Sequence, residues 1–344
     1  MKYFRINQFE KTKKFLSSID KYSLVYHKDS DGVCSAVLLS KILKNPDFQS
    51  PNDLPSIEIS KELFKKVNQY PKAVFVDLAI DQLNFQDIKT KTLVVDHHVT
   101  KNNLNQVTDN FVHVNPRLKD PDVYIPASYL VYKILEKMKK NVKKYSWIAS
   151  VGIVGDRGTK NCKDVIELTQ KQNKMDIKEL DFISNLIEAS KGVKGIMGIS
   201  EAYNIFYESE SPVDIVNSKL IRYYHKYQKE INNLMTDFDY HSEYFPETNS
   251  YLYEIRSRYN VSGVLSTKIS EKNPDAAFFI YKTRNYLFVS ARCQTSRINV
   301  GKILKELSEG LGKGGGHPQA AGASVPKKYS EEFLERLRSY LSGA

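Results

Sequence analysis

Three short apolar runs in the N-terminal part of the chain lead directly into acidic or imidazole side chains. Residues 23–26, 73–76 and 92–95 consist mainly of apolar, β-branched and aromatic residues without regular polar alternation. Such runs are typical of strands that are buried on both faces, as in a parallel sheet. A helical pattern over 33–43, ended by Asn45-Pro46, separates the first two runs. The pattern therefore predicts a parallel α/β sheet.

The middle of the chain has a helical pattern. Segments 127–137 and 145–154 are predicted helices, and helical residues continue to about position 208. From Ser211-Pro212 onward, apolar residues recur every three or four positions as far as Phe238, with Asp214 at a capping-box position. This spacing predicts one long amphipathic helix that connects two domains.

The pattern changes again near residue 250. Short apolar runs predict strands, and two periodic segments predict helices. The predicted strands are 251–255, 276–281 and 286–290, and the predicted helices are 300–307 and 331–341. Together they predict a second, smaller α/β domain, which agrees with a length of 344 residues.

Composition narrows the classes of partner and compartment. The net charge of +11 favours a polyanionic partner such as nucleic acid, although a lysine-rich solvated surface explains it equally well. Three widely spaced cysteines without metal or redox spacing indicate a reduced, cytoplasmic environment. The N-terminus has no apolar core typical of a signal peptide, and no apolar run approaches the ~20 residues of a membrane span.

Acidic and imidazole residues follow the predicted strands and one predicted helix. Ligands of α/β proteins bind at the carboxyl ends of parallel strands, so these residues are expected to converge. Carboxylates and imidazoles together suit Mn²⁺, Mg²⁺ or Zn²⁺, and one carboxylate can bridge two ions. The set has enough members for two ions and consists of Asp29, Asp31, Asp77, Asp96, His97, His98 and Asp156.

Five segments resemble, in order, the motifs of the DHH phosphoesterases, a family that includes RecJ-like and nanoRNase-like enzymes. The segments are HKDSDG (27–32), VFVD (74–77), VVDHH (94–98), SVGIVGD (150–156) and GKGGGHPQAAGAS (312–324). The resemblance implies a DHH catalytic domain over 1–208, a helical linker over 209–245 and a DHH-associated substrate-binding domain over 246–344. It also implies an active-site cleft between the two domains.

The resemblance assigns a role to each member of the set. It implies that Asp29 and Asp77 bind one metal ion, and that Asp31, Asp77, His97 and Asp156 bind the second. Asp96 resembles an orienting acid, and His98 resembles a residue that faces the substrate phosphate. Many family members have a ligand histidine where this chain has Val25. His27 is therefore either a further ligand or a histidine hydrogen-bonded beside the site.

The C-terminal motif has a physical basis of its own. Glycines allow backbone to approach a ligand closely and expose amide donors for an anion, although a glycine run is also common in flexible turns. The resemblance implies that Gly315, Gly316 and His317 bind substrate. It also implies this role for Arg292, whose guanidinium suits a phosphate. His113, by contrast, is expected to be a strand histidine without a functional role.

The resemblance implies a phosphodiesterase that uses two Mn²⁺ or Mg²⁺ ions, with Asp77, Asp96 and His98 in the catalytic group. The expected substrate is single-stranded RNA or DNA, or short oligonucleotides, degraded to mononucleotides. One alternative is a phosphohydrolase of small molecules such as cyclic dinucleotides, pApA, phosphoadenosine phosphate or polyphosphate. Another is a non-catalytic, RecJ-like replication protein. A homodimer is one assembly that the sequence allows.

Overall fold

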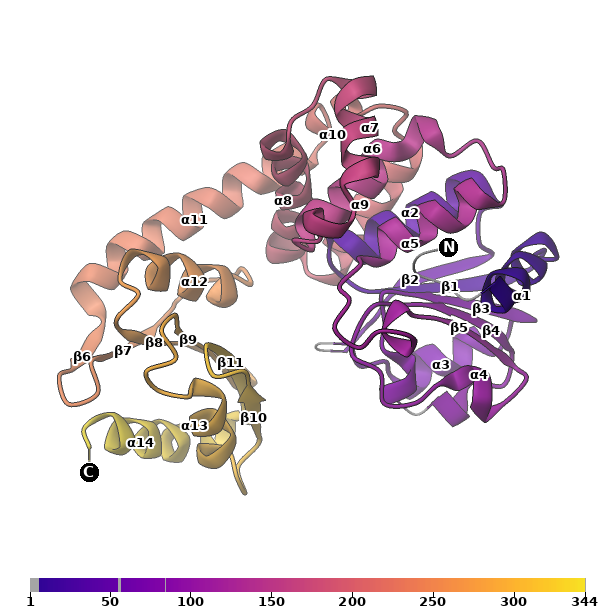
Figure 1. The fold of residues 1–344 in the computed structure, drawn as a ribbon. Coiled ribbons are helices and arrows are strands. Elements are labelled where there is room, and N and C mark those ends of the chain that lie inside the picture. The colour runs from indigo at the N-terminus through magenta and orange to yellow at the C-terminus, as the bar shows by residue number, and fades with distance from the viewer. Residues whose placement is uncertain (1–5, 55–56, 84, 344) are drawn as a thin grey trace. The chain divides into compact units, whose positions relative to one another are not determined.

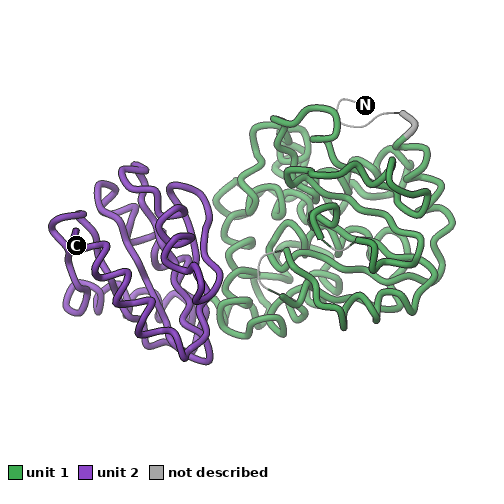
Figure 2. The backbone as a smooth tube through the Cα atoms, turned by 90° about the horizontal axis from the view of Figure 1, so that it is seen from below, with its two compact units in different colours: residues 1–224 green, residues 225–344 purple. Residues whose placement is uncertain are grey.

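The computed structural model describes residues 6–54, 57–83 and 85–343, and the chain forms two compact units, residues 1–224 and 225–344 (Figure 2). The larger unit contains a five-stranded sheet in the order β2-β1-β3-β4-β5. All neighbouring strands pair in parallel. The strands are β1 (Tyr22–Tyr26), β2 (Phe48–Pro51), β3 (Lys72–Val76), β4 (Lys91–Val95) and β5 (Phe111–Val114).

Helices cover both faces of this sheet, as Figure 1 shows, and further helices pack on α2 and α6. The helices of the larger unit are α1 (Ile6–Ser17), α2 (Ser30–Ile42), α3 (Lys61–Val67), α4 (Leu104–Val107), α5 (Ala127–Lys137), α6 (Ser146–Gly155), α7 (Lys163–Asn173), α8 (Ile177–Lys194), α9 (Ile196–Glu208) and α10 (Pro212–Val216). Alternate strand residues are buried against opposite layers: Leu24 belongs to the core with α2 and α5, and Val25 belongs to the core with α3. A strand buried on both faces has no need for polar residues, which explains the unbroken apolar runs.

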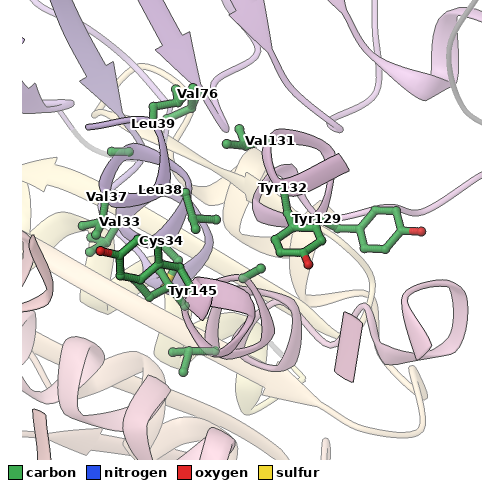
Figure 3. Close-up of a cluster of buried hydrophobic side chains, with 14 of the residues drawn as sticks. Val33, Cys34, Val37, Leu38, Leu39, Val76, Tyr129, Val131, Tyr132 and Tyr145 are labelled. Carbon is green, nitrogen blue, oxygen red and sulfur yellow. The ribbon is translucent and has the colours of Figure 1, made fainter. Parts of the chain in front are cut away.

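The core of the larger unit is centred on α2. Its side chains at Val33, Cys34 and Leu38 are fully buried, and Figure 3 shows them beside Tyr132 and Tyr145. Helix α2 is surrounded by α5, α6 and α9 as well as by the sheet. This burial fixes the start of α2, which carries two of the predicted site residues.

The smaller unit is built on a mixed six-stranded sheet in the order β10-β11-β9-β8-β7-β6. Its strands are β6 (Glu243–Phe245), β7 (Ser250–Glu254), β8 (Ala277–Thr283), β9 (Tyr286–Cys293), β10 (Lys313–Gly316) and β11 (Ala320–Pro326). Its helices are α12 (Ser262–Lys272), α13 (Val300–Leu307) and α14 (Ser330–Leu341), and α11 (Leu220–His241) begins in the larger unit. Helix α12 lies on one face of the sheet, and α13 and α14 lie on the other (Figure 1). Within the described part of the chain, no helix is long and apolar enough to span a membrane.

The predicted fold class is confirmed, and most predicted elements occur within a few residues of their expected bounds. The prediction of one long helix up to Phe238 was wrong, because the chain turns at residues 217–219 between α10 and α11. The Ser218 hydroxyl there accepts a hydrogen bond from Leu220 N at 3.2 Å. Apolar spacing that continues across a short turn cannot reveal this break. The predicted capping box is confirmed, since Asp214 accepts from Ser211 N at 2.9 Å.

Helix α2 begins three residues earlier than predicted. The Asp29 carboxylate caps it by accepting a hydrogen bond from Gly32 N at 3.0 Å. Strands β10 and β11 were not predicted, because glycine and alanine do not give the apolar alternation of a strand. Strand β2 was missed as well, since it contains few apolar residues.

Gly152 on α6 permits the close helix contact next to the predicted site. A Cβ atom at this position would lie 2.5 Å from Ser128 Oγ and 3.1 Å from Asp31 Oδ1. We expect Gly152→Ala to lower the free energy of unfolding by about 1–3 kcal/mol through overpacking. Gly263→Ala on α12 is the matched control, because its Cβ would meet nothing within 4 Å. Urea unfolding of both variants tests this, and equal shifts of the unfolding midpoint would contradict it.

Candidate metal centre

The site lies at the carboxyl edge of the parallel sheet in the larger unit. His27 follows β1, Asp77 follows β3, and Asp96 follows β4, and these three strands are adjacent in the sheet. Because neighbouring parallel strands end at the same edge, residues far apart in sequence become neighbours here. Asp156 reaches the same place from the end of α6, as the distance of 3.5 Å from its Oδ2 to His97 Nε2 shows.

Asp77 is the central side chain of this site. Its Oδ2 lies 3.4 Å from His27 Nδ1, and its Oδ1 lies 3.1 Å from His97 Nε2. The side chain is 1% exposed, yet no described residue makes a well-formed hydrogen bond to either oxygen. The backbone of Asp77 has φ of 58°, in the left-handed region. Its N–H donates a hydrogen bond to Val95 O at 2.9 Å, which continues the pairing between β3 and β4. A strained backbone and an unsatisfied buried carboxylate commonly occur together at functional sites.

Asp31 is held by the start of α5. Its oxygens accept hydrogen bonds from Ala127 N at 2.6 Å and Ser128 N at 2.9 Å, and the Ser128 hydroxyl also donates to it. The positive end of a helix stabilises a carboxylate in this position. Both bonds from Ser128 go to Oδ1, whereas Oδ2 accepts only from Ala127 N and keeps a lone pair that can bind a cation.

The acids of this edge repel one another. Burial raises the pKa of Asp31 well above its ordinary value, and the charges of Asp77 and Asp156 raise it further. Burial likewise raises the pKa of Asp156 to about 6. Burial lowers the pKa of His97, but Asp77 and the other carboxylates outweigh it and bring the pKa to about 10. The directions of these pKa shifts indicate an excess of negative charge at this edge of the sheet, which a bound positive ion would compensate.

The donor set fits divalent cations. Within the described residues, three overlapping groups each place their ligand atoms within 4.8 Å of one another. The groups are Asp77 with His97 and His98, His27 and Asp29 with Asp77, and Asp31 and His97 with Asp156. Asp77 belongs to two groups, and its unsatisfied oxygens are those that a bridging carboxylate would offer. The structure thus brings together the predicted ligands of the N-terminal part, although their individual roles stay predictions.

His27 makes a close pair with an acid rather than standing apart from the site. Its Nδ1 lies 2.6 Å from Asp29 Oδ2. Burial lowers the pKa of His27, but the Asp29 and Asp77 carboxylates outweigh it and raise the pKa well above its ordinary value. A cation held by Asp29 and Asp77 would compete with a proton on His27 for these carboxylates.

His98 is oriented by Asp96. Its Nδ1 lies 2.7 Å from Asp96 Oδ1, and its ring is partly exposed. Asn115 donates hydrogen bonds to Asp96 Oδ2 at 3.2 Å and to His98 O at 3.0 Å, which fixes the pair on its far side. Such a carboxylate sets which imidazole nitrogen carries the proton. Asn115 was not identified in the sequence, because it is distant in the chain and belongs to no predicted motif.

Tyr124 is a second residue that the sequence did not indicate. Its hydroxyl donates to Asp156 Oδ2 at 2.7 Å, and its ring meets that of His97 edge to face at 5.1 Å. It comes from the irregular segment between β5 and α5, where no periodicity or motif points to function. Only the tertiary structure places it beside the centre.

A further buried group lies behind the Asp96–His98 pair. Asp81, Asp96 and His113 have ligand atoms within 4.8 Å of one another. Asp81 accepts from Lys101 N at 2.6 Å and Asn102 N at 2.9 Å. His113 lies in strand β5, as predicted, and burial lowers its pKa. These contacts secure the loop that follows His98.

The remaining predicted residues belong to the smaller unit. Arg292 on β9 is half-buried, and its Nε donates to Thr267 Oγ1 at 3.2 Å. Gly315 and Gly316 lie in edge strand β10 with φ of 146° and 145°, so glycine is required there. His317 is exposed, and its N–H donates to the O of Ala320, the residue that pairs with Arg292. The structure places these residues at one end of this sheet, and their role in substrate binding stays a prediction.

The fold and this arrangement define an α/β protein with a cluster of metal-type ligands at a parallel sheet edge. Two family models match the chain: the DHH family N-terminal domain over residues 21–155 and the DHHA1 domain over residues 249–343. The chain therefore contains an N-terminal domain of the DHH family and a C-terminal DHHA1 domain. None of the curated proteins that were compared matches the sequence.

Solved structures with the same fold include proteins of different kinds. RecJ from Thermus thermophilus in complex with Mn²⁺ has a TM-score of 0.73 and 16% identity, over 99% of this chain and 56% of that one. The chain thus spans about half the length of that RecJ. A pGpG-specific phosphodiesterase from Vibrio cholerae has a TM-score of 0.51 and 13% identity, over 94% and 99% of the two chains. CDC45 from Entamoeba histolytica has a TM-score of 0.62 and 9% identity, over 98% and 99%.

Metal affinity should depend on pH through Asp156. Its pKa of about 6 in the metal-free protein means that it is largely ionised at pH 7.5 and largely protonated at pH 5. Because a cation binds the ionised form, Mn²⁺ affinity should fall roughly tenfold between these values from this group alone. Calorimetric titration with Mn²⁺ measures it. Asp156→Asn should bind more weakly and with a flatter pH profile, and an identical pH profile in both proteins would contradict the assignment.

The Tyr124 hydroxyl should strengthen metal binding indirectly. Tyr124→Phe keeps the ring against His97 and removes only the hydrogen bond to Asp156. Loss of such an orienting partner typically weakens metal binding by about tenfold or more. Tyr240→Phe, at a 79% exposed position on α11, is the matched control. Mn²⁺ titration of Tyr124→Phe that matched the wild-type affinity would show that the hydroxyl has no such role.

Proposed function

We propose that this protein is a two-metal-dependent phosphodiesterase that hydrolyses single-stranded RNA or DNA, or short oligonucleotides, to mononucleotides. The observation that carries the proposal is the Asp77 carboxylate, which is buried, unsatisfied and shared by two groups of potential ligands. Mn²⁺ or Mg²⁺ would be held by Asp29 and Asp77 on one side. Asp31, Asp77, His97 and Asp156 would hold the second ion, with His27 beside the first.

Two divalent cations bound here would supply Lewis-acid stabilisation of phosphate charge and a water of lowered pKa at neutral pH. The residues of the chain would orient the reaction around them. Tyr124 and the start of α5 hold Asp156 and Asp31 in place before substrate arrives. This preorganisation avoids rearrangement of charged groups during the reaction.

His98 is the residue that we assign to the substrate phosphate. Asp96 occupies its Nδ1, so Nε2 is the nitrogen left to donate a proton or a hydrogen bond. Burial lowers the pKa of His98, but the Asp96 carboxylate outweighs it and raises the pKa above its ordinary value. A cationic His98 near neutral pH would neutralise charge that develops on a phosphate oxygen.

Two lysines add positive charge to the same region. Burial lowers the pKa of Lys191, but its ion pair with Glu188 at 2.5 Å outweighs burial and raises the pKa, and the charge of Asp29 contributes less. Burial, assisted by the charge of Lys191, lowers the pKa of Lys28 to about 8. Positive groups beside a cluster of acids suit an anionic substrate that must approach those acids.

The choice of a nucleic acid rests on several features together. The chain has a net charge of +11, and its fold is shared with RecJ. The likeness to the pGpG-specific phosphodiesterase favours a second candidate, a phosphohydrolase of small nucleotides. The clustering of the predicted ligands supports these two enzymatic candidates, and the fold that the chain shares with CDC45 supports the non-catalytic alternative. The salt dependence of substrate binding distinguishes the two enzymatic candidates. A protein that contacts several phosphates of a nucleic acid loses affinity steeply as the salt concentration rises, whereas binding of a small nucleotide should depend little on salt.

Asp77→Asn should remove hydrolysis, since the amide cannot bridge two cations. With Mn²⁺ and end-labelled RNA and DNA ladders, we expect a loss on the order of a thousandfold. The metal-free variant should remain at least as stable as wild type, because the repulsion between Asp77 and the neighbouring buried acid Asp31 is removed. Asp164→Asn, at a 54% exposed side chain, is the matched control. Hydrolysis by Asp77→Asn at the wild-type rate, or none by wild type on any ladder or dinucleotide, would overturn the proposal.

A further inference from the structure

Strand β9 of the smaller unit presents two aromatic rings to solvent. Leu287 and Val289 face the core under α13 and α14, whereas Tyr286 and Phe288 on the opposite face are 46% and 44% exposed. The two rings are neighbours, with centroids 6.1 Å apart and an interplanar angle of 38°. Because these two rings are exposed to solvent, their presence side by side on the sheet is not explained by packing in the hydrophobic core of this unit.

The surroundings of the two rings are low and uncovered. Helix α12 covers the other end of β9, where Ser266 Oγ lies 3.0 Å from Ser290 Oγ and Thr267 meets Arg292. Beside the rings, β11 contributes small residues, since Ser324 pairs with Phe288 and Gly322 pairs with Ser290. A Cβ at Gly322 would meet nothing closer than 3.4 Å. A flat group can therefore lie over this part of the sheet without displacing a side chain.

The charges around the rings are positive. Lys313 on β10 pairs with Ser324, so it lies in the same cross-strand row as Phe288, and its side chain is exposed. Arg284 precedes Tyr286 in the tight turn between β8 and β9 and is exposed as well, and its Nη2 donates to Ser257 O at 3.3 Å and Arg258 O at 2.8 Å. Arg292 lies on the same face of β9, four residues beyond Phe288, which is about 13 Å along a strand. The exposed aromatic rings of Tyr286 and Phe288 therefore have positively charged side chains near them, from Lys313 in the cross-strand row and from Arg284 in the β8–β9 turn.

We propose that Tyr286 and Phe288 form a base-stacking platform for single-stranded RNA or DNA, with Lys313 and Arg284 beside its backbone. Each base offers a π-face to an aromatic ring, and the adjacent cations match the phosphate charge. Two rings two residues apart on a strand, about 7 Å, can hold successive bases, as sheet-face aromatics do in other single-strand binders. The choice of nucleic acid rests on the proposed function, and the platform extends it to strands of several nucleotides.

Binding without hydrolysis tests the platform. The full-length protein is titrated, in EDTA, into a fluorescent oligothymidylate of roughly twelve nucleotides, and anisotropy is measured at several salt concentrations. Tyr286→Ala and Phe288→Ala should each weaken binding roughly tenfold. The slope of log K against log salt should not change, because no charge is removed. Tyr286→Phe and Phe288→Tyr should keep the wild-type affinity.

Three controls distinguish base stacking from charge-based binding and from general effects of substitution. Tyr240→Ala, at a 79% exposed tyrosine of α11, should bind like wild type. Lys313→Ala should weaken binding and reduce the salt slope by about one ion, unlike the ring variants. An abasic strand of the same length should bind wild type more weakly and should not distinguish wild type from Phe288→Ala.

Several outcomes would overturn the platform. The proposal is wrong if the alanine variants bind the base-bearing strand as tightly as wild type does. It is also wrong if their affinity for the abasic strand falls by the same factor as their affinity for the base-bearing strand. It is also wrong if the variants dissociate a dimer in sedimentation, which would make the rings a contact between copies of the chain. Ring-dependent binding by a protein that hydrolyses nothing with Mn²⁺ would support the platform while removing the proposed catalytic function.

Discussion

Mutual repulsion between buried carboxylates is the constraint on which the larger unit depends. Asp31, Asp77 and Asp156 come from three distant segments and converge where little water can screen them. The chain compensates two of them itself, through the start of α5 and through Tyr124. Asp77 has ion-pair contacts to His27 and His97 but no well-formed hydrogen bond among the described residues. Positive ions bound here would reduce the remaining repulsion, which would link metal binding to the electrostatics of the fold.

The rest of the larger unit keeps these groups in position. Adjacent parallel strands bring His27, Asp77 and Asp96 to one edge, and the buried helix α2 fixes Asp29 and Asp31 at its first turn. Gly152 lets α6 approach closely enough for Asp156 to reach the same edge. Because each side chain projects from the end of a packed element, its position is set by the core rather than by a flexible loop.

The smaller unit separates two tasks between the faces of one sheet. One face packs against α13 and α14 and forms one buried core of this unit. The other is covered by α12 only in part, and the uncovered part carries Tyr286, Phe288 and Lys313. The proposed function requires a protein that holds a polymer as well as cleaves it. The ligand cluster of one unit and the basic aromatic surface of the other would serve these two tasks.

The sequence by itself determined the parallel sheet, the smaller second α/β part and which acidic and imidazole residues of the N-terminal part converge. Unbroken apolar runs ending in acids are local signals, and strand burial and ligand chemistry follow from residue type. Only the tertiary structure decided the turn between α10 and α11, the glycine-rich strands β10 and β11, and the contacts of Tyr124 and Asn115. These depend on which distant segments meet, and hydrogen bonds between such segments leave no periodic pattern in the chain.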